Sequence, residues 1–381
     1  MLFNKYDIKN YKLGLVLLTV LLTGLGILVL GSAESSVQLT QLLGLLLGLF
    51  VMVVVSLFDY QWILKFNWLS YGGCIVLLLA VILFGDTSGG AQRWIDLGFI
   101  RFQPSELCKI LLILFFAQFF YQFKDELNTV KTLGISVGLI ALPLLLILKQ
   151  PDLSTTVVVA LVFCSMIFMA GLHRKIIWTI LAVAIPLFVV LMIIVIQPGQ
   201  KLLEDYQQNR ILAWLYPDEY STEEAMQQQN SMMAIGSGRI SGKGLNNDEV
   251  DSLKNGNFVP EPQTDFIFAV VGEELGFVGC SAIIILLFLI VMNILAIGRH
   301  AKDGAGELIC VGVASLIGLQ STVNICVATG LLPNTGVTLP FVSYGLTSLV
   351  SLFIGIGLVL NVGLQPGRYD RWETRNDYWL S

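Results

Sequence analysis

The chain has 381 residues, of which 55% are hydrophobic and 13% are charged, and its mean hydropathy is +0.78. A single water-soluble core cannot accommodate this much apolar surface, so the composition excludes an ordinary soluble domain. The net charge is −5, and no basic stripe alternates with aromatic residues, which argues against nucleic-acid binding. A glycine-rich Walker-type phosphate loop is also missing from the sequence, which argues against transport driven directly by ATP hydrolysis within this chain. We therefore expect an all-α, polytopic membrane protein, with residues 1–381 forming a single membrane domain.

Ten apolar runs are long enough to cross a bilayer of about 30 Å. They lie near residues 11–31, 39–57, 64–84, 107–123, 132–148, 153–171, 175–196, 266–297, 308–330 and 345–364. The sequence thus predicts about ten transmembrane helices, with a long loop at 197–263 between the seventh and the eighth. Because some runs are short or closely spaced, nine or eleven helices remain open. The first run has about 20 apolar residues and precedes many others, so we interpret it as an uncleaved signal anchor.

Basic residues in the connecting segments predict the orientation. With both termini in the cytoplasm, thirteen lysines and arginines fall on the inner side and only four on the outer side: Arg93, Arg101, Lys109 and Lys149. The long loop at 197–263 is then extracytoplasmic. Both histidines, His173 and His300, fall in cytoplasmic turns, which argues against a Ser-His-Asp hydrolase or a histidine-ligated zinc site on the outer face. The six cysteines lie in apolar runs without a CxxC pair, so neither a disulfide frame nor a metal site is expected from them.

Asp265 lies at the entrance of the eighth apolar run, where a charge is costly and therefore indicates a function. Helical steps of about 100° per residue from Asp265 place Gly272, Gly276 and Gly279 on nearly the same face, as a small-residue stripe suited to close helix contact. The carboxylate is then expected to face protein or a cavity. The alternative is an interfacial charge stabilised by the dipole at a helix N-terminus.

A predicted hairpin carrying Arg93 leads into a helix that starts at Pro104, with Glu106 in its first turn. Arg93, Arg101 and Lys109 at one membrane mouth are suited to clamp a diphosphate, because arginines form forked hydrogen bonds and lysine supplies a point charge. The alternative is that Glu106 and Lys109 pair with each other while the arginines reach the lipid headgroups.

Three further segments combine irregular backbone with polar side chains: the turn at 149–152, the glycine-rich stretch at 230–244, and the proline- and glycine-broken stretch at 330–345. Closely spaced glycines let backbone amides approach an anion. Broken backbone at a membrane mouth is tolerated where protein or a wet cavity surrounds it. The first two segments also have a simpler interpretation as turns.

These motifs together resemble one known family. The segments that carry the resemblance are Gly90-Ala91-Gln92-Arg93-Trp94, Gln103-Pro104-Ser105-Glu106 with Lys109, Gln150-Pro151-Asp152, the loop Ala234–Gly244, Thr264-Asp265-Phe266-Ile267-Phe268-Ala269 with Glu273-Glu274-Leu275-Gly276, and Leu339-Pro340-Phe341 with Ser343-Tyr344-Gly345. In order and spacing they are similar to the SEDS (shape, elongation, division and sporulation) proteins over residues 10–365. The loop 234–244 looks more like that of the elongation member than that of the division member.

The resemblance implies a ten-helix peptidoglycan glycosyltransferase that polymerises lipid II at the outer face of the cytoplasmic membrane. It also implies a class B penicillin-binding transpeptidase as partner, a place in the cell-elongation machinery, and Asp265 as the catalytic residue. The chain departs from the family pattern in three places. It has Gln263 where His is familiar, Gly345-Leu346-Thr347-Ser348 where a Gly-Gly-Ser-Ser-like run is familiar, and Arg239 where Gly is frequent.

The reaction implied by this resemblance transfers a glycan from undecaprenyl diphosphate to the 4-hydroxyl of lipid II and inverts the anomeric centre. Asp265 is expected to act as general base. The cations are expected to neutralise diphosphates, and a divalent cation such as Mg²⁺ or Mn²⁺ is a candidate cofactor. The expected substrate-binding residues are Arg93, Trp94, Arg101, Glu106, Lys109, Asp152, Ser231, Arg239, Lys243, Thr264 and Ser343. A lipid II flippase and a non-catalytic scaffold for a transpeptidase are the alternatives.

Overall fold

The computed structural model describes residues 10–88, 91–96, 98, 101–197, 205–216, 223–246 and 262–365. Its helices are α1 (Leu13–Ala33), α2 (Ser35–Leu57), α3 (Tyr60–Leu64), α4 (Asn67–Phe84), α5 (Pro104–Gln122), α6 (Val130–Lys149), α7 (Leu153–Met169), α8 (Arg174–Ile196), α9 (Asp205–Leu215), α10 (Glu223–Ser237), α11 (Ile267–Arg299), α12 (Gly304–Ala328) and α13 (Leu346–Leu364), with a 3₁₀ turn at Lys124–Glu126. The strands are β1 (Asp86–Ser88), β2 (Ala91–Asp96) and β3 (Arg101–Phe102).

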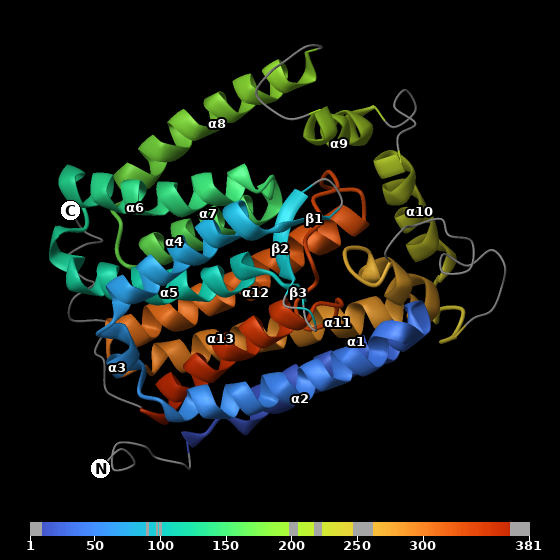
Figure 1. The fold of residues 1–381 in the computed structure, drawn as a ribbon, viewed down its shortest axis with the longest axis horizontal. Helices are drawn as coiled ribbons and strands as arrows, with labels where there is room; N and C mark the ends of the chain where they lie inside the picture. Colours follow the sequence, from blue (N-terminus) through green and yellow to red (C-terminus); the bar gives the residue numbers. More distant parts are fainter. Residues whose placement is uncertain are drawn as a thin grey trace.

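Each of the ten apolar runs coincides with a helix, which confirms the polytopic all-α fold. Within the described part of the chain, eight helices are long and apolar enough to cross a membrane: α1, α2, α4, α5, α6, α11, α12 and α13. At the remaining two runs lie α7, a shorter apolar helix of 17 residues, and α8, which has 23 residues. In Figure 1, α8 diverges from the main bundle along one side.

Most of α5, α12 and α13 is buried, whereas α2, α4 and α6 turn many apolar side chains outward. The second half of α5 carries a buried aromatic cluster. Phe115, Phe116, Phe119 and Phe120 contact one another there, and Phe163 of α7 packs against two of them. An outward apolar surface with a packed aromatic interior is the arrangement expected of helices surrounded by lipid.

The three strands form an antiparallel sheet in the order β1-β2-β3. The sheet lies toward one end of the bundle, where α9 and α10 also lie, and α3 lies at the opposite end (Figure 1). We call the first of these the sheet end. The predicted hairpin is confirmed by β1 and β2, although its glycines at 89–90 fall outside the described residues.

The backbone of α11 corrects one prediction. The helix starts at Ile267, so Asp265 lies in the turn before it. Gly276 then interrupts the helix with φ 65° and ψ −159°. The three glycines therefore do not continue one helical face from Asp265, and the predicted stripe is wrong. The physical reason is that the interruption is stabilised by a segment distant in the sequence.

That segment is the loop at 238–244, which we call the glycine loop. Its amides at Lys243 and Gly244 donate to the carbonyls of Glu273 (3.0 Å) and Glu274 (2.9 Å) before the interruption. In return, the amides of Phe277 and Val278 after the interruption donate to the carbonyls of Arg239 (2.8 Å) and Ile240 (3.2 Å). The loop thus supplies the hydrogen bonds that the interruption takes from the helix.

Candidate functional site

The backbone around Asp265 is fixed by hydrogen bonds from the segment at 339–344. The carbonyl of Gln263 accepts a hydrogen bond from the amide of Tyr344 (2.9 Å), and the carbonyl of Thr264 accepts one from the hydroxyl of Ser343 (2.6 Å). Ser343 is buried. Two of the predicted substrate ligands, Thr264 and Ser343, therefore hold the chain beside Asp265.

Asn324 of α12 completes this support. Its side-chain amide is buried and donates to the carbonyls of Asp265 (2.8 Å) and Val337 (2.6 Å). Three successive carbonyls at 263–265 are thus each bound by a different partner, so the position of the half-buried Asp265 side chain is set by the α12 and 339–344 segments. Asn324 was not among the predicted site residues; its signal in the sequence is an asparagine within an apolar run.

The Asp265 carboxylate and a cation both lie close to Gly336. A methyl group at Gly336 would lie 3.2 Å from Oδ2 of Asp265 and 4.0 Å from Nη1 of Arg210. Gly336 has a φ of 73°, which glycine adopts without steric cost. Arg210 comes from α9, in a stretch whose polar sequence gave no indication of a site.

Gly336 also lines a polar cavity at the sheet end. The other lining residues are Arg93, Gln103, Glu106, Lys109, Asp152, Thr155, Val158, Gln320, Val337 and Thr338. The cavity offers about 40 Å³ to the centres of water molecules. That is enough for a few waters but not for a sugar. Asp265 and Arg210 lie beside its Gly336 wall, so a large substrate in this geometry reaches the rim of the cavity and not its interior.

Glu106 and Lys109 form an ion pair across one turn of α5, with 2.8 Å between Nζ and Oε1. Lys109 also donates to Oε1 of Gln320 (2.9 Å). Both charged side chains are at least 90% buried. A buried charge is stable only when it is paired and hydrogen-bonded, and these contacts provide both. The pairing of Glu106 with Lys109, given above as the alternative to the diphosphate clamp, is therefore present, and the pair forms one wall of the cavity.

The turn at 149–152 stabilises the fold and also contributes to the cavity wall. Asp152 is buried and caps α7 by accepting hydrogen bonds from the amide (3.0 Å) and the hydroxyl (2.9 Å) of Thr155. Arg93 of β2 donates to the carbonyl of Pro151. The capping confirms the turn interpretation of this segment. Asp152 also lines the polar cavity, and its role in substrate binding stays a prediction.

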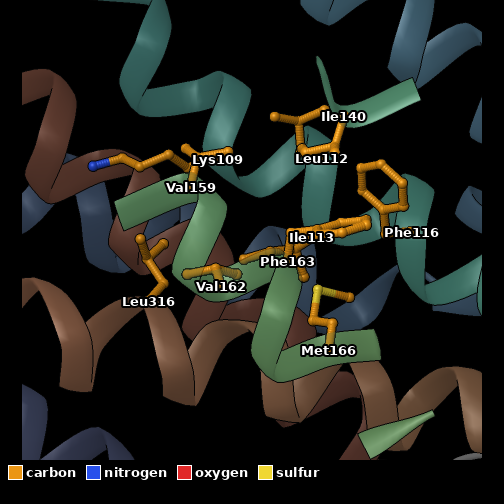
Figure 2. Close-up of a pocket in the computed structure, with 10 residues that line it drawn as sticks. All are labelled: Lys109, Leu112, Ile113, Phe116, Ile140, Val159, Val162, Phe163, Met166 and Leu316. Atoms are coloured by element: carbon orange, nitrogen blue, oxygen red, sulfur yellow. The ribbon is translucent and has the colours of Figure 1, made fainter. Parts of the chain in front are cut away.

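A second, apolar pocket lies on the other side of Lys109. Figure 2 shows the Lys109 stem beside Leu112 and Val159, with its amine nitrogen extending away from the apolar side chains. This pocket has about 10 Å³ for the centres of water molecules, so it is a packed, dry region. Lys109 thus separates the polar cavity from the aromatic core.

Besides Thr264 and Ser343, five predicted ligands lie outside the set that lines the polar cavity. Arg101 of β3 is exposed, and Trp94 of β2 is half-buried. Ser231 of α10 is buried and donates to the carbonyl of Ala328 (2.8 Å). In the glycine loop, Arg239 is exposed and Lys243 forms an ion pair with Glu273 at 2.8 Å. The structure therefore brings Arg93, Glu106, Lys109 and Asp152 together around one cavity but does not add these five to its walls.

Among the described residues, no three His, Cys, Asp or Glu side chains are grouped closely enough to hold a metal ion between them.

Comparison with protein families places these features in a known context. The profile of the FtsW, RodA and SpoVE family, described as cell cycle protein, matches residues 7–366. The chain is 35% identical over 379 residues to a protein from Geobacter sulfurreducens named "Probable peptidoglycan glycosyltransferase FtsW", covering 94% of this chain and 96% of the relative. It is 38% identical over 317 residues to "Peptidoglycan glycosyltransferase MrdB" from Escherichia coli K12, covering 83% of this chain and 82% of the relative.

Two solved structures with a similar fold also come from peptidoglycan-synthesis and rod-shape proteins. A structure described as "Structural coordination of polymerization and crosslinking by a peptidoglycan synthase complex" matches with a TM-score of 0.76 and 28% identity, covering 100% of both chains. The rod shape determining protein RodA from Thermus thermophilus matches with a TM-score of 0.66 and 27% identity, covering 95% of this chain and 97% of that chain.

Proposed function

The chain belongs to the SEDS family of peptidoglycan glycosyltransferases, and we propose that it polymerises lipid II with Asp265 as the general base. The observation that supports this role is the placement of Asp265. Its backbone is held by α12 and by the 339–344 segment, and its carboxylate lies at the rim of a polar cavity that contains two cations.

In this reaction the 4-hydroxyl oxygen of the acceptor lipid II bonds to the anomeric carbon of the donor glycan. The bond between that carbon and the diphosphate breaks, and undecaprenyl diphosphate leaves with the bonding electrons. Asp265 takes the hydroxyl proton, a step worth about 10²–10⁴-fold in rate. Attack opposite to the leaving group inverts the anomeric centre, so a second nucleophilic carboxylate is not required.

Arg93 and Lys109 supply positive charge from within the cavity and stabilise the diphosphate as it leaves. We include a divalent cation in the proposal, because Mg²⁺ needs only one or two carboxylates when substrate phosphates provide further oxygen ligands. The carboxylates available near the substrate are Glu106 and Asp152 on the cavity wall and Asp265 at the rim. Polymer formation by the purified protein is then expected to fall after treatment with EDTA and to return on addition of Mg²⁺ or Mn²⁺.

We place the sheet end, with α9 and α10, outside the cytoplasmic membrane, and both termini in the cytoplasm, on the basis of the basic-residue asymmetry. Cysteine substituted at Ser241 in the glycine loop is then expected to react with an impermeant maleimide in intact cells. Labelling only after lysis would place Asp265 on the wrong side for lipid II.

A class B penicillin-binding transpeptidase is the partner we propose, because one structural relative comes from a complex that coordinates polymerisation with crosslinking. We assign the chain to cell elongation from its loop at 234–244 and its similarity to a rod shape determining protein.

The purified protein in lipid vesicles distinguishes this function from the two alternatives. A polymerase converts lipid II into glycan chains, and Asp265→Asn loses this conversion. A flippase moves fluorescent lipid II between leaflets without polymer, and a scaffold does neither. Lipid movement without any glycan would overturn the proposed function.

A further inference from the structure

Arg210 of α9 lies beside the proposed base, and the sequence gave no reason to include it in the site. Its guanidinium and the Asp265 carboxylate approach the same point at Gly336, at 4.0 Å and 3.2 Å from a methyl group built there. Gly336 is part of the cavity wall. Arg210 therefore lies where a substrate too large for the cavity would rest.

The position of Arg210 is fixed by the anchoring of α9 at both ends. Gln208 donates from its side-chain amide to the carbonyls of Val195 (2.8 Å) and Gln197 (3.0 Å) at the end of α8. Trp214 donates from its indole to the carbonyl of Gly330 (2.9 Å). Because Arg210 and Trp214 are four residues apart, they share one face of the helix, and that face is turned toward the 330–336 segment.

The charges around the cavity show why a cation at this position matters. The two cations and the two carboxylates that line the cavity cancel formally. The Asp265 carboxylate then adds an excess negative charge to the site, and this charge repels a diphosphate. A further cation beside Asp265 offsets that repulsion.

The cations inside the cavity are also committed to internal partners. Lys109 donates to both Glu106 and Gln320, and Arg93 donates to the carbonyl of Pro151. Their charge acts on the rim, but their geometry is fixed by the protein. An arginine on the rim has a planar fork of five donors that matches diphosphate oxygens.

We propose that Arg210 binds the diphosphate of the lipid-linked substrate at the rim beside Asp265. This inference rests on the proposed function, since it names the ligand of the same site. The two residues at the rim then have different roles. Asp265 accepts a proton from the acceptor hydroxyl, while Arg210 binds the diphosphate and thereby orients the lipid-linked sugar.

Binding of geranylgeranyl diphosphate to the purified full chain in detergent tests this role without turnover. The uncharged alcohol geranylgeraniol, measured under the same conditions, reports binding of the prenyl chain alone. Arg210→Met is expected to raise the Kd for the diphosphate by about tenfold or more, because a charge-assisted contact is lost. Arg210→Lys is expected to be intermediate, and the Kd for geranylgeraniol is expected to be unchanged in both variants.

Arg299→Met, which removes an exposed arginine at the far end of α11, is the matched control and is expected to bind the diphosphate like the wild type. Thermal unfolding of each variant confirms that the protein is folded. If folded Arg210→Met bound the diphosphate as tightly as the wild type, or lost the alcohol and the diphosphate equally, the proposal would be overturned. Failure of the proposed function would look different: the wild type would bind the diphosphate with Arg210 dependence yet form no glycan from lipid II.

Discussion

The two halves of α5 are both buried, but they are filled by different chemistry. The first half carries the Glu106–Lys109 pair, which borders a wet polar cavity with irregular segments around it. The second half carries Phe115, Phe116 and their neighbours, packed without room for water. In the first half, polar groups occupy space that apolar side chains would pack more stably, so changes there are expected to affect activity. In the second half, changes are expected to affect stability.

Among substitutions in α5 and the segments around the cavity, the largest loss of polymer formation is expected at Lys109. Lys109→Met removes charge from the cavity and should lower polymer formation by about 10²-fold, chiefly through weaker substrate binding, while Lys109→Arg keeps part of the activity. Lipid II binding and turnover measured on the same preparation check this. The competing account is purely structural, because loss of Lys109 strands the buried Glu106 carboxylate.

The double variant Glu106→Gln with Lys109→Met separates these accounts. If Lys109 acts on the substrate, the double variant folds and remains inactive. A folded and fully active double variant would show that the pair serves only the fold.

A smaller loss is expected from Gly336→Ala. The added methyl group lies 3.2 Å from the Asp265 carboxylate, and alanine must adopt the positive φ of Gly336, which costs about 1–2 kcal/mol in an L-residue. We expect polymer formation to fall by about tenfold, because small misplacements of a reacting group are costly. Gly171→Ala is the matched control: its φ is 108° and the space around it is open, so it should cost stability without lowering the activity of the folded protein.

The aromatic half is tested by Phe116→Ala. The cavity that this substitution leaves in the core should lower the free energy of unfolding by about 3 kcal/mol or more and lower the Tm. The activity of the molecules that remain folded should stay near that of the wild type. Phe288→Ala on the exposed face of α11 should leave Tm almost unchanged. A loss of activity in folded Phe116→Ala larger than its loss of stability would show that the two halves of α5 do not divide function in this way.

The smallest effect is expected at Lys243, whose partner is Glu273 and not the cavity. Lys243→Met should reduce polymer formation only about two- to fivefold, through loosening of the glycine loop. Adding Glu273→Gln should restore part of the loss by removing the stranded carboxylate. The initial sequence prediction, a direct substrate contact by Lys243, requires that the second substitution brings no recovery.

Features that depend on local sequence were predictable. Apolar runs located ten helices, and the proline at position 104 with charges three residues apart predicted both the start of α5 and the Glu106–Lys109 pair. The position of Asp265 at a helix entrance was also visible, because a carboxylate beside a long apolar run is unusual.

Features that depend on contacts between distant segments were not predictable. The interruption of α11 at Gly276 requires hydrogen bonds from a loop more than 30 residues earlier, and no local pattern encodes that pairing. Arg210 lies in a polar stretch in which many charged residues would look alike. Only the anchoring of α9 through Gln208 and Trp214 brings that particular arginine to Gly336.

The central claim is that Asp265 performs the chemistry at a site formed by the rest of the sheet end. Its most direct test is Asp265→Asn, assayed for lipid II binding and for glycan formation in the same preparation, because asparagine keeps the shape of aspartate but cannot act as a base. The account predicts that lipid II affinity stays within about threefold while glycan formation falls by about 10²-fold or more. Glycan formation near the wild-type rate by purified Asp265→Asn would contradict it.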